Sequence, residues 1–306
     1  MANLKLVKEL REQTGSGIAD CNKALAECND NLQEAIDYLR KKGLSSAAKK
    51  SSRTTSEGLI ATIVNNNKAA IIEINAETDF VSKNDKFQTL VENIANIAIN
   101  YDNLESLKSA NYPNSSASVE DEIKNQISVI GENMNLRRVN SLSITNGVIT
   151  QYIHNKVKGN MGKLGVLVAL ESNTNDKKKL EELGKKISMH IAATKPEALN
   201  IESISEEKLS RETEILKEQA RASGKPENII EKMIQGRIRK YYEEIVLLEQ
   251  NFVMDDKLKV KDVLQNYSKE LGSDIKISDF KLLVLGDGIE KKEDDFADEV
   301  SKIINN

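Results

Sequence analysis

Residues 69–83 read Ala-Ala-Ile-Ile-Glu-Ile-Asn-Ala-Glu-Thr-Asp-Phe-Val-Ser-Lys, and this stretch decides the fold of the first half of the chain. Its apolar part, Ala69 to Ala76, is strand-like and passes into a helical pattern without a glycine or proline turn. Ser82 and Asp85 have the spacing of a capping box, and apolar residues then recur at helical spacing. We therefore expect a helix that begins just after the tetrad Thr-Asp-Phe-Val, residues 78–81, with Phe80 at the junction.

Phe80 can be interpreted in two ways. A large apolar side chain at a strand-to-helix junction can be inserted into a partner. Alternatively, it can fold back as part of a hydrophobic staple that fixes the entry of the helix. The residues by themselves favour neither interpretation.

Outward from this stretch, a hairpin followed by helices is predicted twice. The first unit has strands at 59–64 and 69–74 joined by Asn65-Asn66-Asn67, helices at 83–100 and 119–130, and a strand at 136–144 that ends in the turn Asn146-Gly147. The second has strands at 147–153 and 165–170 and a helix at 177–193. The strands alternate imperfectly, which fits helices that cover one sheet face. We predict an α+β fold with two related core subdomains.

Helices are predicted on both flanks of this core. Three short helices, the last ending before Gly43, form an amino-terminal module, and the basic segment 40–53 is expected to be a mobile linker. A helical hairpin begins at the cap Ser205, turns at Gly224 and resumes with Pro226 in the first helical turn. The expected parts are a three-helix module with its linker at 1–52, subdomains at 55–145 and at 146–204 with 250–306, and the hairpin at 205–249. The tail should add a strand at 280–285, a turn at 286–288 and an acidic helix with Phe296, Val300 and Ile303.

Composition narrows the functional classes. The 306 residues can form two cores, and a net charge of −4 argues against a protein that grips phosphate backbones over its whole surface. Without a signal peptide or an apolar run of about 20 residues, we expect a cytoplasmic protein. Cys21 and Cys28 lie about two helical turns apart, roughly 10 Å, too far for a disulfide. His154 and His190 have no nucleophile pattern, and the glycines match no nucleotide fingerprint, so we expect no enzyme, cofactor or metal site.

Two motifs carry a resemblance to a known family. Residues 73–83, Glu-Ile-Asn-Ala-Glu-Thr-Asp-Phe-Val-Ser-Lys, and residues 10–25, Leu-Arg-Glu-Gln-Thr-Gly-Ser-Gly-Ile-Ala-Asp-Cys-Asn-Lys-Ala-Leu, resemble the signatures of the bacterial elongation factor Ts family. Segments at 130–133, 137–138, 189–196, 223–226 and 286–291 resemble it too, so the likeness covers nearly the whole chain. Departures are Ala76 where the family usually has a cysteine, Ala19 where a bulkier apolar residue is common, and a loop at 155–165 that is longer than usual.

The resemblance implies a guanine-nucleotide exchange factor that binds elongation factor Tu and releases its GDP. It implies a UBA-like amino-terminal module and a coiled-coil hairpin. It places Thr78, Asp79, Phe80 and Val81 at the partner's magnesium site, which they would disturb. Other implied partner contacts are Arg11, Ile18, Ala19, Lys23, Ile130, Gly131, Glu132, Asn133 and His154. His190 is instead expected to be a satisfied core histidine.

Two further functional classes remain open from the residues. An RNA- or ribosome-binding adaptor would use the basic linker, and a dimerising scaffold would use the helical hairpin. Neither membrane binding nor direct nucleic-acid binding is required by the exchange-factor interpretation.

Overall fold

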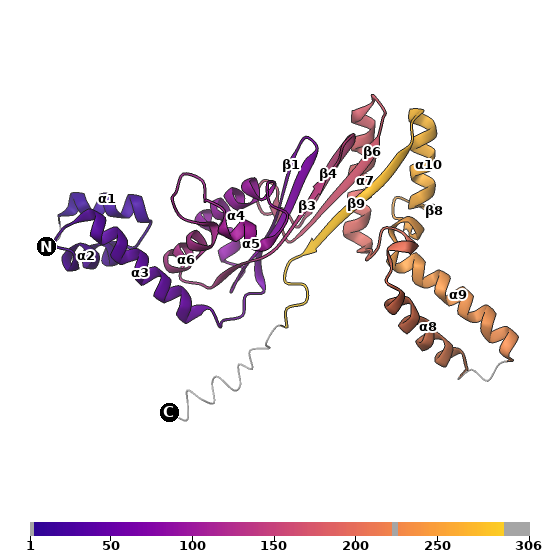
Figure 1. The fold of residues 1–306 in the computed structure, drawn as a ribbon, viewed down its shortest axis with the longest axis horizontal. Coiled ribbons are helices and arrows are strands. Elements are labelled where there is room, and N and C mark those ends of the chain that lie inside the picture. The colour runs from indigo at the N-terminus through magenta and orange to yellow at the C-terminus, as the bar shows by residue number, and fades with distance from the viewer. Residues whose placement is uncertain (1–2, 222–225, 291–306) are drawn as a thin grey trace.

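The computed structural model describes residues 3–221 and 226–290, and within them the chain is built around two antiparallel sheets (Figure 1). The first sheet has the strand order β3-β2-β1-β5 and the second has the order β4-β6-β9. The strands of the first sheet are β1 (Glu57–Asn65), β2 (Lys68–Ala76), β3 (Met134–Ser143) and β5 (Met161–Gly162). Those of the second are β4 (Gly147–His154), β6 (Leu164–Ser172) and β9 (Ile275–Val284). The predicted α+β class is confirmed.

The first hairpin forms where the sequence predicts it. β1 pairs with β2 from Glu57 opposite Ala76 to Asn65 opposite Lys68, and Asn66 in the connecting turn has a positive φ of 52°. Every residue of β2 after Lys68 is buried. This burial on both faces explains why the strand alternates imperfectly.

Helices cover the outer face of each sheet. They are α4 (Asp85–Ala98), α5 (Leu104–Ser109) and α6 (Val119–Ile130) on the first, and α7 (Lys177–Thr194) and α10 (Val260–Leu271) on the second (Figure 1). The inner faces pack on each other through Ile60 and Ile71 of one sheet and Leu167 of the other. At Gly165 a Cβ atom would lie 2.7 Å from the Ile60 side chain. Any larger residue at Gly165 would therefore require the isoleucine side chains around it to shift.

The capping box predicted at Ser82 and Asp85 is wrong. The side chain of Asn84 caps α4 instead, accepting hydrogen bonds from the backbone N–H groups of Lys86 and Phe87. Ser82 lies in a 3₁₀ turn, Val81–Lys83, and its hydroxyl donates to the carbonyl of Asp79. This turn lies between the strand and the helix, so the helix begins at Asp85, later than expected.

The third helix of the amino-terminal module is longer than predicted, and the mobile linker is wrong. The module contains α1 (Leu4–Thr14), α2 (Ile18–Glu27) and α3 (Leu32–Lys50). α3 runs through Gly43, which is buried where a Cβ atom would lie 3.4 Å from Cβ of Ser128 on α6. Arg40 pairs with Asp121 of α6 at 3.5 Å, and Ala47 belongs to the core beneath the first sheet. These tertiary contacts outweigh the weak helix propensity of glycine.

The helical hairpin consists of α8 (Glu206–Arg221) and α9 (Glu227–Ile245). Ser205 accepts a hydrogen bond from the N–H of Lys208, as expected of a cap, whereas Pro226 precedes α9 as its N-cap instead of lying in its first turn. The expected helix end at Gly224 and the tail helix with Phe296, Val300 and Ile303 lie outside the described residues. The four-part division of the chain stays a prediction.

Smaller elements complete the described chain. They are the strands β7 (Asn251–Phe252) and β8 (Asp255–Lys259) and the 3₁₀ turns Ile201–Ser203 and Leu247–Glu249. None of the helices in residues 3–221 and 226–290 is long and apolar enough to cross a membrane.

Candidate partner-binding site

The tetrad of residues 78–81, which we call the tip, joins β2 to the turn before α4. Phe80 is 76% exposed, whereas its neighbour Val81 is 4% exposed and lies in the core of the first sheet. Val81, and not Phe80, therefore packs into the core at this junction. The hydrophobic staple that the sequence allowed for Phe80 is wrong, because an exposed ring cannot fix the helix entry.

The tip is held by hydrogen bonds on both sides of Phe80. The N–H and the hydroxyl of Thr78 both donate to the carboxylate of Glu132, at 2.9 and 2.7 Å. On the other side, the backbone N–H groups of Ser82 and Lys83 donate to the carbonyls of Asp79 and Phe80, both at 3.1 Å. The exposed ring is thus carried by an ordered backbone.

The segment Ile130 to Asn133 lies beside the tip, and several of its residues have structural roles within the chain. Gly131 ends α6 with a φ of 94°, a left-handed conformation that favours glycine. Asn133 is buried, and its side-chain amide donates to the carbonyl of Arg53 at 2.9 Å. Glu132 is half-buried against Thr78. Partner contact by these residues stays a prediction.

The four candidate residues of the amino-terminal module are all exposed. Arg11 lies in the last turn of α1, Ile18 and Ala19 begin α2, and Lys23 follows Ala19 by one turn. Ile18 is 55% exposed, so its apolar side chain is available for contact with a partner.

Contacts of α4 bring these groups to one side of the tip. Lys86, in the first turn of α4, donates to the carbonyl of Gly15 between α1 and α2 at 3.0 Å. Asp85 lies 3.8 Å from the ammonium of Lys158, in the loop that follows His154. The module, the tip and the end of β4 therefore all border the start of α4.

His154 is exposed at the end of β4, and its Nδ1 lies 3.2 Å from the Tyr152 hydroxyl. The long loop after it contains β5, in which Met161 pairs with Ala61 of β1. This strand is not predicted from the sequence. The available signal was Met161, an apolar residue in a loop of mostly polar residues and glycines.

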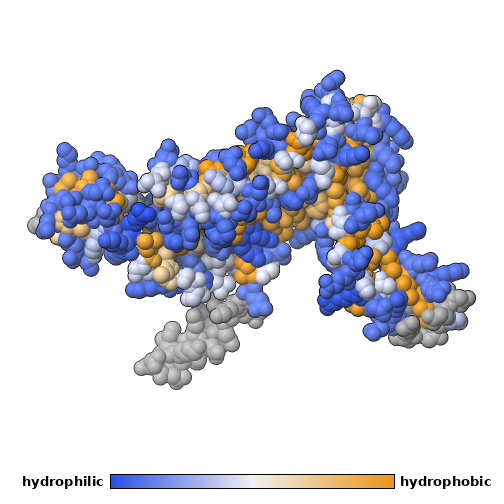
Figure 2. Space-filling view, viewed as in Figure 1, coloured by the Kyte–Doolittle hydropathy of each residue, from blue (hydrophilic) through white to orange (hydrophobic). Residues whose placement is uncertain are grey.

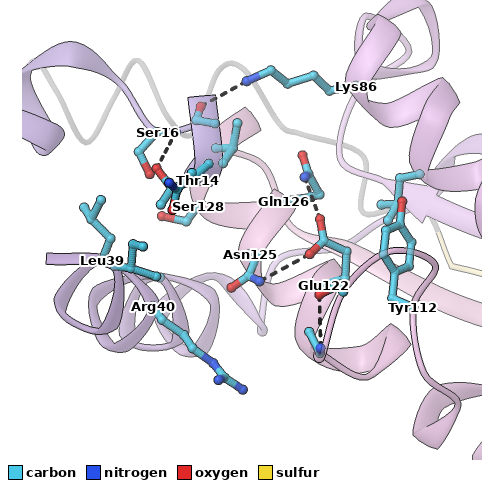
Figure 3. Close-up of a pocket in the computed structure, with 18 of the residues that line it drawn as sticks. Thr14, Ser16, Leu39, Arg40, Lys86, Tyr112, Glu122, Asn125, Gln126 and Ser128 are labelled. Carbon is cyan, nitrogen blue, oxygen red and sulfur yellow. Dashed lines mark hydrogen bonds between the residues drawn. The ribbon is translucent and has the colours of Figure 1, made fainter. Parts of the chain in front are cut away.

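Between the module and the core lies a cavity of about 560 Å³, shown in Figure 3. The module contributes Thr14, Ser16 and Arg40, and the core contributes Glu122 and Gln126, whose side chains hydrogen-bond to each other. Apolar side chains, among them Leu39, Leu90 and Val129, also line this cavity. Beside this cavity, the module is held to the core by the packing of α3 on α6 and by the Lys86 contact.

The two histidines and two cysteines singled out from the sequence have the following surroundings in the structure. His190 is buried and accepts a hydrogen bond at Nδ1 from the N–H of Val253, while its Nε2 lies 2.9 Å from Gln250 Oε1. Burial lowers the pKa of His190, and the prediction of a satisfied core histidine is confirmed. Cys21 and Cys28 are free thiols, and burial raises the pKa of Cys21. Within the described residues no group of three or more His, Cys, Asp or Glu side chains could hold a metal ion.

A family model described as elongation factor TS matches residues 77–287. The chain is 49% identical to elongation factor Ts of Rhodospirillum centenum, with 97% of each chain covered. It is 48% identical to that of Rickettsia bellii and 51% identical to that of Rhodospirillum rubrum, with 97% of this chain and 96% of each relative covered.

The chain belongs to the elongation factor Ts family. Members of the elongation factor Ts family are translation elongation factors of protein biosynthesis that act as nucleotide-exchange factors. The exposed tip lies inside the matched region, and the amino-terminal candidate residues precede it.

Proposed function

We propose that this chain binds the GDP form of elongation factor Tu, releases GDP and magnesium, and leaves when GTP returns. The observation that carries the proposal is the exposure of Phe80 on a hydrogen-bonded tip. Because the ring is 76% exposed in the free chain, its burial by a partner would stabilise the complex. Full burial of such a side chain contributes about 1.5 to 3 kcal/mol.

In the proposed mechanism, Asp79 and Phe80 enter the GTPase domain beside its magnesium site, and Thr78 and Val81 shape the tip. The magnesium charge on the β-phosphate is among the strongest local attractions that hold GDP. A small shift of the groups that support the ion therefore raises the dissociation rate of GDP. The chain itself supplies no catalytic group, and it acts in the cytoplasm, where translation takes place.

The other candidate residues supply docking affinity in this proposal. Arg11, Ile18, Ala19 and Lys23 meet the GTPase domain, and His154 meets another domain of the partner. The contacts of Lys86 with Gly15 and of Lys158 with Asp85 support a single continuous surface around the start of α4.

Release of labelled GDP from purified elongation factor Tu, with and without this chain, tests the function. Phe80→Ala should slow the stimulated release by at least about tenfold, because the apolar insertion is lost. Its melting temperature should hardly change, since the ring is exposed. Met254→Ala, at another exposed apolar side chain, is the control and should exchange normally. Normal exchange by Phe80→Ala would rule out the insertion.

A homodimer through the helical hairpin is a second candidate. Ile215 on α8 and Ile229 on α9 are 40% and 43% exposed, and Figure 2 shows an apolar stripe along the hairpin. Sedimentation equilibrium of the full chain and of Ile215→Lys tests it. A dimer that the substitution dissociates supports the proposal, and a monomeric unsubstituted chain at high concentration refutes it.

A further inference from the structure

Two carboxylates brace the base of the tip against the end of α6 in a reciprocal arrangement. Glu132 accepts hydrogen bonds from the N–H and hydroxyl of Thr78, which lies 54 positions away in the chain. In return, Glu77 accepts a hydrogen bond from the N–H of Asn133 at 2.5 Å. Each pair of neighbours thus supplies one carboxylate and one backbone donor to the other. We call Glu77, Thr78, Glu132 and Asn133 the cross-brace.

The α6 side of the cross-brace is rigidly placed. Ile123 and Ile127 of α6 are buried in the core of the first sheet, and Gly131 ends the helix in its left-handed conformation. Glu132 follows at once, so its position is fixed by packing behind it. Hydrogen bonds to an ionised carboxylate are roughly twice as strong as neutral ones.

The cross-brace also reaches the chain that arrives from the amino-terminal module. Arg53 Nη1 lies 3.3 Å from Glu77, and the Asn133 side chain donates to the carbonyl of Arg53. Glu77 and Asn133 thus tie the end of this connection to the tip. Neither residue is as exposed as Phe80, which lies three positions after Glu77.

We propose that Glu132 is a positioning residue that acts through Thr78 and holds Asp79 and Phe80 in the geometry that enters the partner. This inference rests on the proposed function. Its physical basis is preorganisation, since a tip that is already ordered loses less conformational freedom on binding. Glu132 then contributes to exchange without touching the partner.

A double-mutant cycle separates positioning from direct contact. Glu132→Ala removes both acceptors, and we expect GDP release at saturating concentrations of the chain to slow by about tenfold. Thr78→Val removes only the hydroxyl donor and should slow GDP release less than Glu132→Ala does. Thr78→Ser keeps that donor, so its rate of GDP release should be closer to that of the unsubstituted chain. If Glu132 acts through Thr78, the double variant Glu132→Ala with Thr78→Val is no slower than Glu132→Ala alone. Losses that multiply would overturn the proposal in favour of a direct partner contact.

A second measurement needs no partner. The chain contains no tryptophan, so Phe80→Trp introduces a single indole at the tip. In this background Glu132→Ala should lower the fluorescence anisotropy of the indole, because the tip becomes mobile. Glu105→Ala, at an exposed glutamate of α5, is the matched control and should leave it unchanged.

The outcomes distinguish this inference from the proposed function. Unchanged anisotropy in Glu132→Ala would refute the positioning role, even if Phe80→Ala abolishes exchange. Normal exchange by Phe80→Ala would refute the insertion, even if the anisotropy falls. Melting curves of each variant show whether a loss of exchange comes from unfolding.

Discussion

His190 lies among buried side chains of the second sheet and its helices, where its ring contacts Phe252 and its two nitrogens have the partners Gln250 and Val253. Since Nδ1 accepts from a backbone N–H, the proton of the neutral ring sits on Nε2 and is donated to Gln250. Burial lowers the pKa of His190 from its ordinary value of 6.5, and the hydrogen bond to Gln250 opposes this shift.

This shift predicts a pH dependence of folding. Below about pH 6.5 the unfolded chain binds a proton that the folded chain does not, so the folded chain loses stability as pH falls toward the lowered pKa. We expect the free-energy penalty of His190→Gln to be smaller at pH 5.5 than at pH 7.5, by up to about 1.4 kcal/mol per pH unit. Urea unfolding at both pH values measures this, with His154→Gln as the exposed control. A penalty independent of pH would contradict it.

Gly147 gives a second prediction for a single residue. It begins β4 with a φ of 141°, and a Cβ atom there would lie 1.9 Å from the carbonyl oxygen of Leu170. Gly147→Ala should therefore lower the free energy of unfolding by about 3 kcal/mol or more. Gly236→Ala, on α9 where a Cβ atom meets nothing within 4 Å, should instead raise it by roughly 0.5 to 1 kcal/mol. Equal effects of both would show that the clash at Leu170 is relieved at little cost.

The sequence predicted where Phe80 lies but not how the tip is held. The pattern of apolar and capping residues relates positions only a few residues apart, and this was enough to place Phe80 between a strand and a helix. The bonds from Thr78 to Glu132 and from Asn133 to Glu77 join positions more than 50 residues apart, which no local pattern can reveal. The sequence therefore predicts partner contacts for Gly131 and Glu132 but not their contacts within the chain, which only the structure shows.

At the level of elements, prediction succeeded where the apolar period was strong. The predicted helix at 119–130 is α6 itself, and both predicted hairpins form. The predicted end of α3 before Gly43 was wrong, because glycine has low helix propensity and the lysines around it suggested a solvated segment. The contact of Gly43 with Ser128 is tertiary, so only the folded neighbour shows why the helix continues.

This contact predicts that Gly43→Leu separates α3 from α6. A Cβ atom at Gly43 would already touch Ser128, and a leucine that extends beyond it would overpack the site, which typically costs about 1 to 3 kcal/mol. We expect the displaced module to weaken docking, so that GDP release falls more at limiting than at saturating concentrations of the chain. Lys41→Leu places the same side chain on the exposed face of α3 and serves as the control. Equal losses at both concentrations would argue against a docking role for the module.

In the whole molecule, the packing of the two sheets is the feature that the sequence did not predict. The turn Asn146-Gly147 was recognised, but it leads from β3 in one sheet to β4 in the other instead of joining neighbours in one sheet. The periodicity of a strand indicates which of its side chains share a face. It does not indicate to which sheet the strand belongs. Likewise β5 crosses to the first sheet with only two residues, too short for a periodic signal.

Exchange by insertion makes a prediction for the whole complex, because binding linkage is reciprocal. If this chain weakens the binding of GDP to elongation factor Tu by some factor, GDP must weaken the complex by the same factor, with each tenfold equal to about 1.4 kcal/mol. Magnesium should share this antagonism, since the tip is proposed to act at its site. Titration calorimetry of the full chain into nucleotide-free and GDP-loaded elongation factor Tu, with and without magnesium, gives all four affinities. Phe80→Ala should reduce the difference between the affinities for the nucleotide-free and the GDP-loaded forms. Equal affinity of the unsubstituted chain for both forms would rule out exchange by displacement, because a ligand that binds two states equally shifts neither.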